Sequence, residues 1–165
     1  MESVTIERLG MKDAEVLIAF LQRPEIDGSF LPPLSQRPVS IATRVHSKME
    51  SGFWLIARRG TEILGCRGCN GLVDPVFRIV EFSTMSLAPE ARGLGLGKLL
   101  MVEAIALSLQ LYQPRQIRLD STEGNQAMAG LMKSLGFRVS RVYPDPEKRP
   151  PGVRSVEYIL DISPS

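Results

Sequence analysis

The sequence predicts an α/β (α+β) fold, with short strands and helices following one another along a single domain of residues 1–165. A chain of 165 residues suits one folding unit. Its hydrophobic share of 44% and charged share of 23% are typical of a globular protein with a sizeable core. The apolar spacing also switches repeatedly between the period of a strand and that of a helix. The resulting element order is β-α-α-β-β-β-α-β-α-β-β.

The N-terminal part of the chain predicts one strand and two helices. Alternating apolar residues at 4–6 indicate the strand, and residues 11–21 carry apolar side chains at helical spacing. Two consecutive prolines exclude a regular helix from 28–38, so this stretch is expected to be a semi-rigid loop. A second, weaker helical pattern covers 40–50.

A β-hairpin is expected next. Residues 53–57 and 63–69 read as strands on either side of a turn at 59–61. Turn-forming residues then predict a loop at 70–75.

The C-terminal half begins with a strand that is apolar on both faces, residues 78–87. The helix expected over 93–111 is apolar nearly all round, which predicts that it is mostly buried. Gly136 is expected to end a later helix in the left-handed conformation. The remaining elements are a strand at 116–120, a helix at 125–135, a strand at 137–143, a Pro-rich loop at 144–152 and a strand at 155–162.

Charge and cysteine content exclude several classes of function. The net charge is only +2 and the basic residues are scattered, which argues against nucleic acid as a partner. No signal sequence or membrane-spanning stretch is apparent, so the expected location is the cytoplasm. Cys66 and Cys69 have no second ligand pair and His46 is the single histidine, so we expect structural thiols and no metal site.

The segment most informative about chemistry runs from Leu87 to Lys98, where a strand ends, a helix begins and three glycines occupy alternate positions. Glycines allow positive φ and close approach of a ligand. The first turn of a helix offers unpaired N–H groups and the positive end of its dipole. With Arg92 nearby, the segment predicts a site for a phosphate or pyrophosphate.

Spacing excludes two common phosphate-binding motifs. A P-loop requires glycine five positions before Gly97 and Ser or Thr after Lys98, but Arg92 and Leu99 stand there. The dinucleotide fingerprint G-x-G-x-x-G would require glycine at position 98 or 100, and neither position has one.

The pattern that does match is Arg or Gln, two residues, Gly, one residue, then Gly or Ala, met by Arg92, Gly95 and Gly97. In this respect the sequence resembles the GNAT superfamily of N-acetyltransferases. The strand ending in Met-Ser-Leu-Ala-Pro-Glu at 85–90 and the block at 125–137 are similar to two further parts of that family. The predicted element order also agrees along the chain.

The resemblance implies a three-layer GNAT-like fold, with a central mixed, mostly antiparallel sheet of about seven strands flanked by about four helices. It implies acetyl-CoA as cofactor and an amine as acceptor. Asn125 is expected to bind the cofactor as well as to cap its helix. The remaining cofactor-binding residues that it implies are Arg92 and the amides of Gly93, Leu94, Gly95, Leu96, Gly97 and Lys98 for the pyrophosphate, with Met85 and Leu87 for the pantetheine arm.

The family transfers the acetyl group directly, without an acyl-enzyme, and a backbone N–H near Leu87 is the expected oxyanion donor by resemblance. Glu81 interrupts an apolar strand, where burial of an unpaired carboxylate would raise its pKa, so it is the leading candidate for the general base. Alternation would place it on one face with residues 79, 83 and 85. A structural ion pair with Arg67 or Arg78 is the alternative for Glu81, and Asp120 is a second candidate for the base.

The general acid departs from the family pattern, because Met132 stands where many relatives have tyrosine. Tyr143, Ser134 or water could supply the proton instead, and Tyr143 could equally be a core aromatic residue. Met132 also supports an alternative function, a catalytically silent acyl-CoA-binding or regulatory domain. A plain structural or interaction domain is a further alternative.

The acceptor is not specified by the sequence. By resemblance it is set by the loops at 28–38 and 144–154. The first loop is apolar and lacks the acidic cluster expected for a polyamine, so a small metabolite, an amino acid or a peptide N-terminus all fit. A homodimer formed through 155–162 would also be compatible with the alternation there.

Overall fold

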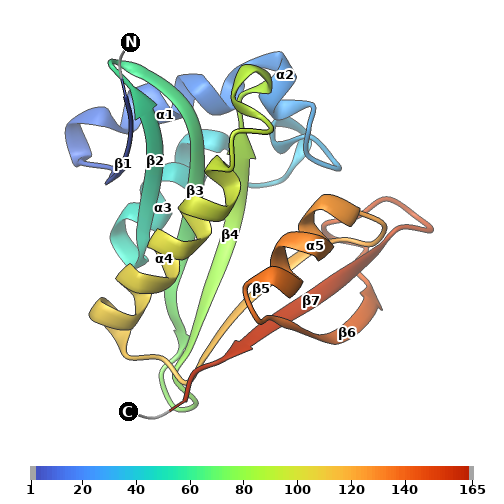
Figure 1. Cartoon of the computed structure of the whole chain (residues 1–165). Coiled ribbons are helices and arrows are strands. Elements are labelled where there is room, and N and C mark those ends of the chain that lie inside the picture. The colour runs from blue at the N-terminus through green and yellow to red at the C-terminus, as the bar shows by residue number, and fades with distance from the viewer. Residues whose placement is uncertain (1–2, 164–165) are drawn as a thin grey trace.

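The computed structural model describes residues 3–163, which form one seven-stranded sheet with helices on both sides (Figure 1). The strand order is β1-β2-β3-β4-β5-β7-β6, and β4 with β5 is the one parallel pair among the described residues. The expected mixed, mostly antiparallel sheet is therefore confirmed. The strands are β1 (Val4–Arg8), β2 (Phe53–Arg59), β3 (Glu62–Asp74), β4 (Ile79–Leu87), β5 (Gln116–Thr122), β6 (Arg138–Pro144) and β7 (Arg154–Asp161).

Helices cover both faces of this sheet. In Figure 1, α4 and α5 lie on the near side, and α1 and α3 lie behind it. The helices are α1 (Ala14–Gln22), α2 (Pro24–Asp27), α3 (Ile41–Ser51), α4 (Leu96–Tyr112) and α5 (Gln126–Ser134), with short 3-10 turns at Met11–Asp13, Leu34–Gln36 and Pro89–Ala91. Helix α2, which brings the number of helices to five in residues 3–163, is a single turn. It begins at Pro24, and proline is favoured at the first position of a helix. No helix within residues 3–163 has the length and apolar character needed to cross a bilayer.

The expected β2–β3 hairpin is confirmed, but the loop expected at 70–75 is wrong. Strand β3 continues to Asp74, and its pairing with β4 shifts register between Cys69 and Gly71 and again before Asp74. Gly71 adopts a φ of 84°, and a Cβ there would lie 1.9 Å from the Ser51 carbonyl oxygen. The turn-forming residues are thus absorbed into the strand as β-bulges.

A bulge in β4 corrects the expectation that residues 79, 81, 83 and 85 share one face. Ser83 pairs with Gly68 and Met85 pairs with Arg67, so Thr84 is an extra residue, and its φ is 65°. One added residue reverses the side-chain alternation of a strand. Met85 therefore points to the opposite side of the sheet from Ser83.

Strands β4 and β5 pair over only three residues and then separate. The paired stretch joins 79–81 of β4 to 116–118 of β5. Beyond it, the end of β4 has no strand partner on the β5 side within residues 3–163, and Figure 1 shows β4 and β5 diverging towards the start of α4. This divergence creates the cleft described below.

The expectation that the helix after the glycines is mostly buried is wrong. Helix α4 buries one stripe, which includes Leu100, Met101 and Ala104, against β2, β3 and β4. Its outer side keeps Leu99 and Val102 more than 40% exposed. The helix covers one face of the sheet and nothing in residues 3–163 covers its outer side, so its all-round apolar composition does not correspond to all-round burial.

The last strand of the chain, β7, lies inside the sheet and not at its edge. β7 lies between β5 and β6 and pairs with both. The segment 155–162 is therefore not available for pairing with a second chain, and β6 forms this edge of the sheet.

Candidate functional site

The glycine cluster forms an open turn at the start of α4. Gly93 and Gly95 have φ values of 78° and 77°, in the left-handed region that favours glycine. Gly95 is the N-cap of the helix. No heavy atom lies within 4 Å of a Cβ built at either position. The turn is therefore shaped by backbone conformation and leaves room for a ligand against it.

The same turn presents unpaired backbone donors. The N–H of Leu99 donates to the Gly95 carbonyl oxygen at 3.2 Å, so the N–H groups of residues 96–98 precede the first bond of the helix. The first turn of α4 contains no acidic residue, and Arg92 and Lys98 are exposed beside it. Donors, dipole and charge together fit a pyrophosphate.

Gly97 connects this turn with the end of β4. A Cβ there would lie 3.7 Å from the Leu87 side chain and 3.8 Å from that of Met85. The strand segment expected to pair with a pantetheine arm thus adjoins the expected pyrophosphate turn, and its unpaired edge faces the gap between β4 and β5.

Asn125 caps α5, as expected. Its Oδ1 accepts a hydrogen bond from the Met128 N–H at 3.1 Å. Asn125 also lines the cleft between β4 and β5. At the other end of α5, Gly136 has the expected left-handed conformation, with a φ of 88°.

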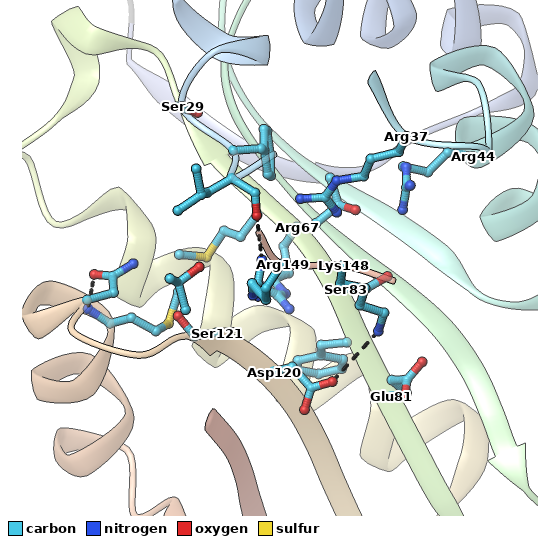
Figure 2. A pocket seen from close by; sticks show the side chains of 18 residues that line it. Ser29, Arg37, Arg44, Arg67, Glu81, Ser83, Asp120, Ser121, Lys148 and Arg149 are labelled. Atoms are coloured by element: carbon cyan, nitrogen blue, oxygen red, sulfur yellow. Dashed lines mark hydrogen bonds and ion pairs between the residues drawn. The ribbon is translucent and has the colours of Figure 1, made fainter. Parts of the chain in front are cut away.

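The cleft has a volume of about 220 Å³ and lies where β4 and β5 separate (Figure 2). Arg67 of β3 lines the cleft, and four further parts of the chain contribute to its walls. They are β4 and β5 with the start of α5, the loop around Ser29 to Leu31, two arginines near or on α3, and the loop before β7 with Lys148 and Arg149. The loops expected to set the acceptor therefore meet over the end of β4.

Glu81 lies on the wall of this cleft, at the last paired position of β4 with β5. Its Oε1 accepts a hydrogen bond from Asn70 Nδ2 at 2.7 Å, and its Oε2 forms an ion pair with Arg118 Nε at 3.1 Å. The cationic partner is Arg118, instead of Arg67 or Arg78. Both contacts fix the carboxylate in one orientation.

Asp120 lies across the cleft on β5. Its Oδ2 accepts a hydrogen bond from the Tyr143 hydroxyl at 2.9 Å and lies 3.7 Å from Lys148 Nζ, an ion pair drawn in Figure 2. No partner within residues 3–163 binds its Oδ1. Asp120 is thus oriented from one side and free on the other.

The structure also places the candidates for the general acid. Tyr143 does not line the cleft, and burial together with the hydrogen bond to Asp120 raises its pKa, which makes it a weaker acid. Ser134 donates its hydroxyl to the Leu131 carbonyl oxygen of its own helix. Met132 is fully buried in the core. Within residues 3–163, none of these side chains directs a proton into the cleft.

A group of basic residues near the cleft was not identified from the sequence. Arg37, Arg44 and Arg67 line it, and Lys48 of α3 lies close enough for the charges of Arg44 and Arg67 to act on it. Within residues 3–163, none of the four has a carboxylate at ion-pair distance. A signal was available for Lys48, because it follows Ile41 and Val45 at core spacing on α3. Arg67 likewise interrupts an apolar strand.

The pKa values of these basic groups are lowered. Burial lowers the pKa of Arg37 and of Arg67 to about 10, with Arg44 and Arg149 adding to the effect on Arg37. Burial, followed by the charges of Arg44 and Arg67, lowers the pKa of Lys48 to about 7. The charged forms of these groups are therefore disfavoured by the folded protein.

We expect Lys48→Met to stabilise the protein by roughly 2 kcal/mol near pH 6. The substitution removes the cost of burying the ammonium group, and this cost exceeds the stabilisation lost with the cation–π contact between Lys48 Nζ and the Trp54 ring, whose centroid is 5.4 Å away. The folded pKa lies below the unfolded one, so the wild type gains stability as pH rises from about 7 towards 10.5. Urea unfolding at several pH values should show the difference between the two proteins shrinking over that range. A variant less stable at pH 6 would contradict this.

The two cysteines are free and buried. Burial raises the pKa of Cys66 to about 12 and that of Cys69 to about 11. They lie three residues apart on β3, so their side chains point to opposite faces of the sheet. These thiols are protonated at neutral pH and are poor nucleophiles.

Comparison with protein-family models matches residues 20–137 to the family described as the acetyltransferase (GNAT) family. A search of curated protein sequences finds no match.

Solved structures similar to this chain share its fold at low sequence identity. An acetyltransferase of the GNAT family from Streptococcus pneumoniae has 19% identity and a TM-score of 0.77, covering 98% of this chain and 100% of its own. The structure of yncA from Salmonella typhimurium with its cofactor acetyl-CoA has 19% identity and a TM-score of 0.78, covering 99% and 96%. A spermidine N-acetyltransferase from Vibrio cholerae, in complex with CoA and spermine, has 15% identity and a TM-score of 0.73, covering 96% and 95%.

Proposed function

This chain belongs to the GNAT acetyltransferase family, and from that premise we propose that it transfers the acetyl group of acetyl-CoA directly to an amine, without an acyl-enzyme. The acceptor is an amine of a small molecule or of a peptide. The observation that carries the proposal is the open glycine turn at Gly93 and Gly95, which leads along the unpaired edge of β4 into a cleft with two carboxylates.

The residues proposed to bind the cofactor lie at the start of α4, at the end of β4 and at the start of α5. The amides of 93–98, with Arg92 and the side chain of Lys98, would hold the pyrophosphate. The unpaired edge of β4 near Met85 and Leu87 would hold the pantetheine arm, and Asn125 would donate its amide N–H from the start of α5. When bound, acetyl-CoA supplies an acetyl thioester.

Glu81 is the proposed base. An acceptor amine enters as an ammonium ion and must lose a proton before its nitrogen attacks the thioester carbon. The N–C bond then forms as the C–S bond breaks. Glu81 lies where β4 and β5 begin to separate, and Asn70 and Arg118 hold its carboxylate. It would take the proton directly or through one water. Asp120 is the second candidate, favoured by its unbound Oδ1.

The departing thiolate has no side-chain acid among Tyr143, Ser134 and Met132, so we propose that water relays to it the second proton of the attacking nitrogen. General acid catalysis contributes about 10²- to 10⁴-fold, whereas orientation contributes on the order of 7–11 kcal/mol. The absence of a tyrosine at position 132, where this chain has methionine, is therefore expected to lower the rate without abolishing catalysis.

The test is a steady-state assay of thiol release from acetyl-CoA across a panel of amines. We expect thiol release that depends on the amine, with the acetylated amine identified by mass spectrometry. Acetyl-CoA binding without release for any amine would instead support the silent acyl-CoA-binding domain. The observation that favours this second function is Met132, fully buried where a proton donor is expected.

A further inference from the structure

One wall of the cleft has an excess of positive charge. Five basic residues line the cleft, Arg37, Arg44, Arg67, Lys148 and Arg149, against the two carboxylates Glu81 and Asp120. Both carboxylates already have cationic partners, Arg118 and Lys148. The four arginines therefore have no carboxylate partner in the described part of the chain. Figure 2 shows Arg37 and Arg44 apart from Glu81 and Asp120.

Among the arginines that line the cleft, Arg67 is the one whose buried charge is least accounted for by contacts within the protein. It is 3% exposed, and its Nε has no hydrogen-bond partner within residues 3–163. Its guanidinium stacks on Phe82, 5.3 Å from the ring centroid. The Nε of Arg44 is buried without a partner as well. A buried cation without a counter-ion costs several kcal/mol, and a bound anion offsets that cost.

The other arginines of this wall hold the acceptor loop in place. Arg37 Nε donates to the Pro32 carbonyl oxygen at 3.1 Å, and Arg149 Nη1 donates to that of Leu31 at 2.9 Å. These carbonyl contacts orient the side chains without neutralising them. Asp27 and Asp145 act on Arg37 through their charge without forming an ion pair with it, and Arg149 Nε also donates to Ser155 Oγ at 3.1 Å.

The phosphates of coenzyme A do not account for this wall. None of residues 92–98, which fit the pyrophosphate, lines the cleft. Arg37 and Arg44 instead lie with the loop of Phe30 and Leu31 on the side where the acceptor is expected, and Arg67 enters the same cleft from β3, where it pairs with Met85. An anion bound by these arginines would therefore belong to the acceptor.

We propose that the acceptor amine carries a carboxylate, as an α-amino acid does, and that this carboxylate binds to Arg37, Arg44 and Arg67 while the amino group lies at Glu81 and Asp120. The inference rests on the proposed acetyl transfer and narrows its substrate class. Guanidinium groups match a carboxylate through paired N–H donors. Phe30, Leu31 and Met85 line the same cleft, so an apolar side chain suits the acceptor.

The first experiment compares kcat/KM for L-leucine, L-leucinamide and 3-methylbutylamine, which differ at the carboxylate position. We expect L-leucine to be preferred over the other two by roughly 30-fold or more, as for a charged hydrogen bond. The aminophosphonate analogue of leucine would show whether another anion replaces the carboxylate. Equal or higher kcat/KM for 3-methylbutylamine would overturn the inference and leave the acetyl transfer intact.

Variants of the arginine wall give the second comparison. Arg44→Gln and Arg67→Met are expected to raise KM for L-leucine roughly 10-fold or more, with L-leucinamide little changed. Acetyl-CoA affinity should stay the same, because neither residue adjoins the glycine turn. Arg115→Gln, an exposed arginine outside the cleft, is the matched control. A rise in KM of equal size for both amines would contradict a carboxylate site.

A binding measurement separates this inference from the proposed function. Calorimetry would follow N-acetyl-L-leucine and its carboxamide binding to the CoA-saturated protein, which requires no turnover. Tighter binding of the carboxylate in the wild type, lost in Arg44→Gln and Arg67→Met, supports the site even where every amine assay is negative. Equal binding of both compounds overturns it.

Discussion

Gly95→Asp is expected to lower acetyl-CoA affinity by more than 100-fold. The Cβ of residue 95 would enter the open space beside the start of α4 and carry a carboxylate to the unpaired amides of residues 96–98. A charge pair about 5 Å apart at an effective dielectric constant near 20 repels by about 3 kcal/mol. Calorimetric titration with acetyl-CoA measures this change directly, against a micromolar wild-type affinity of about 8 kcal/mol.

Two control variants separate charge from backbone strain. Asparagine is nearly the same size as aspartate but uncharged, and it tolerates the φ of 77° better than most residues. Gly95→Asn should therefore lose clearly less affinity for acetyl-CoA than Gly95→Asp. Gly152→Asp places the same side chain at another open glycine of positive φ and should bind acetyl-CoA normally. Unchanged binding by Gly95→Asp would mean that the glycine cluster serves only as a turn.

Glu81→Gln is expected to lower kcat by roughly 10²- to 10⁴-fold, the range for loss of a general base. Glutamine preserves the size of the side chain and can still accept the hydrogen bond from Asn70, so the shape of the cleft should persist. Acetyl-CoA affinity should remain as in the wild type, because Glu81 lies outside the glycine turn. Steady-state kinetics with a turned-over amine, paired with calorimetry, would measure both quantities.

Asp120→Asn is the matched variant on the opposite wall. If Glu81 is the base, this change should cost less than about 10-fold in kcat, since it removes only the ion pair with Lys148 and alters the contact with Tyr143. The reverse order of effects would transfer the role to Asp120. Near-wild-type rates for both variants would leave neither carboxylate as the base.

The glycine cluster could be interpreted from the sequence because its chemistry is local. The conformation of Gly93 and Gly95, the free amides of the first helical turn and the cap at Asn125 all depend on residues within a few positions of each other. Hydrophobic periodicity is equally local, so it placed most elements close to their observed bounds. The sheet type followed from the family resemblance.

The errors came from features that depend on distant neighbours. The bulge at Thr84 reverses the side chains that follow it, and nothing in the local pattern marks it. The loop expected at 70–75 is strand because β4 provides a pairing partner across the bulges. The burial of α4 was overestimated because the number of faces that a helix buries is set by the layers around it.

The sequence by itself determined the order of the strands and longer helices, the open glycine turn and the family, because each is encoded by side chains or glycines close together in the chain. Only the tertiary structure brought Arg37 and Arg44 to the same cleft as Arg67, and paired Glu81 with Arg118. These residues come from elements distant in sequence. The burial of the three arginines and the absence of a carboxylate partner for them within residues 3–163 depend on these distant elements, so no local pattern predicts them.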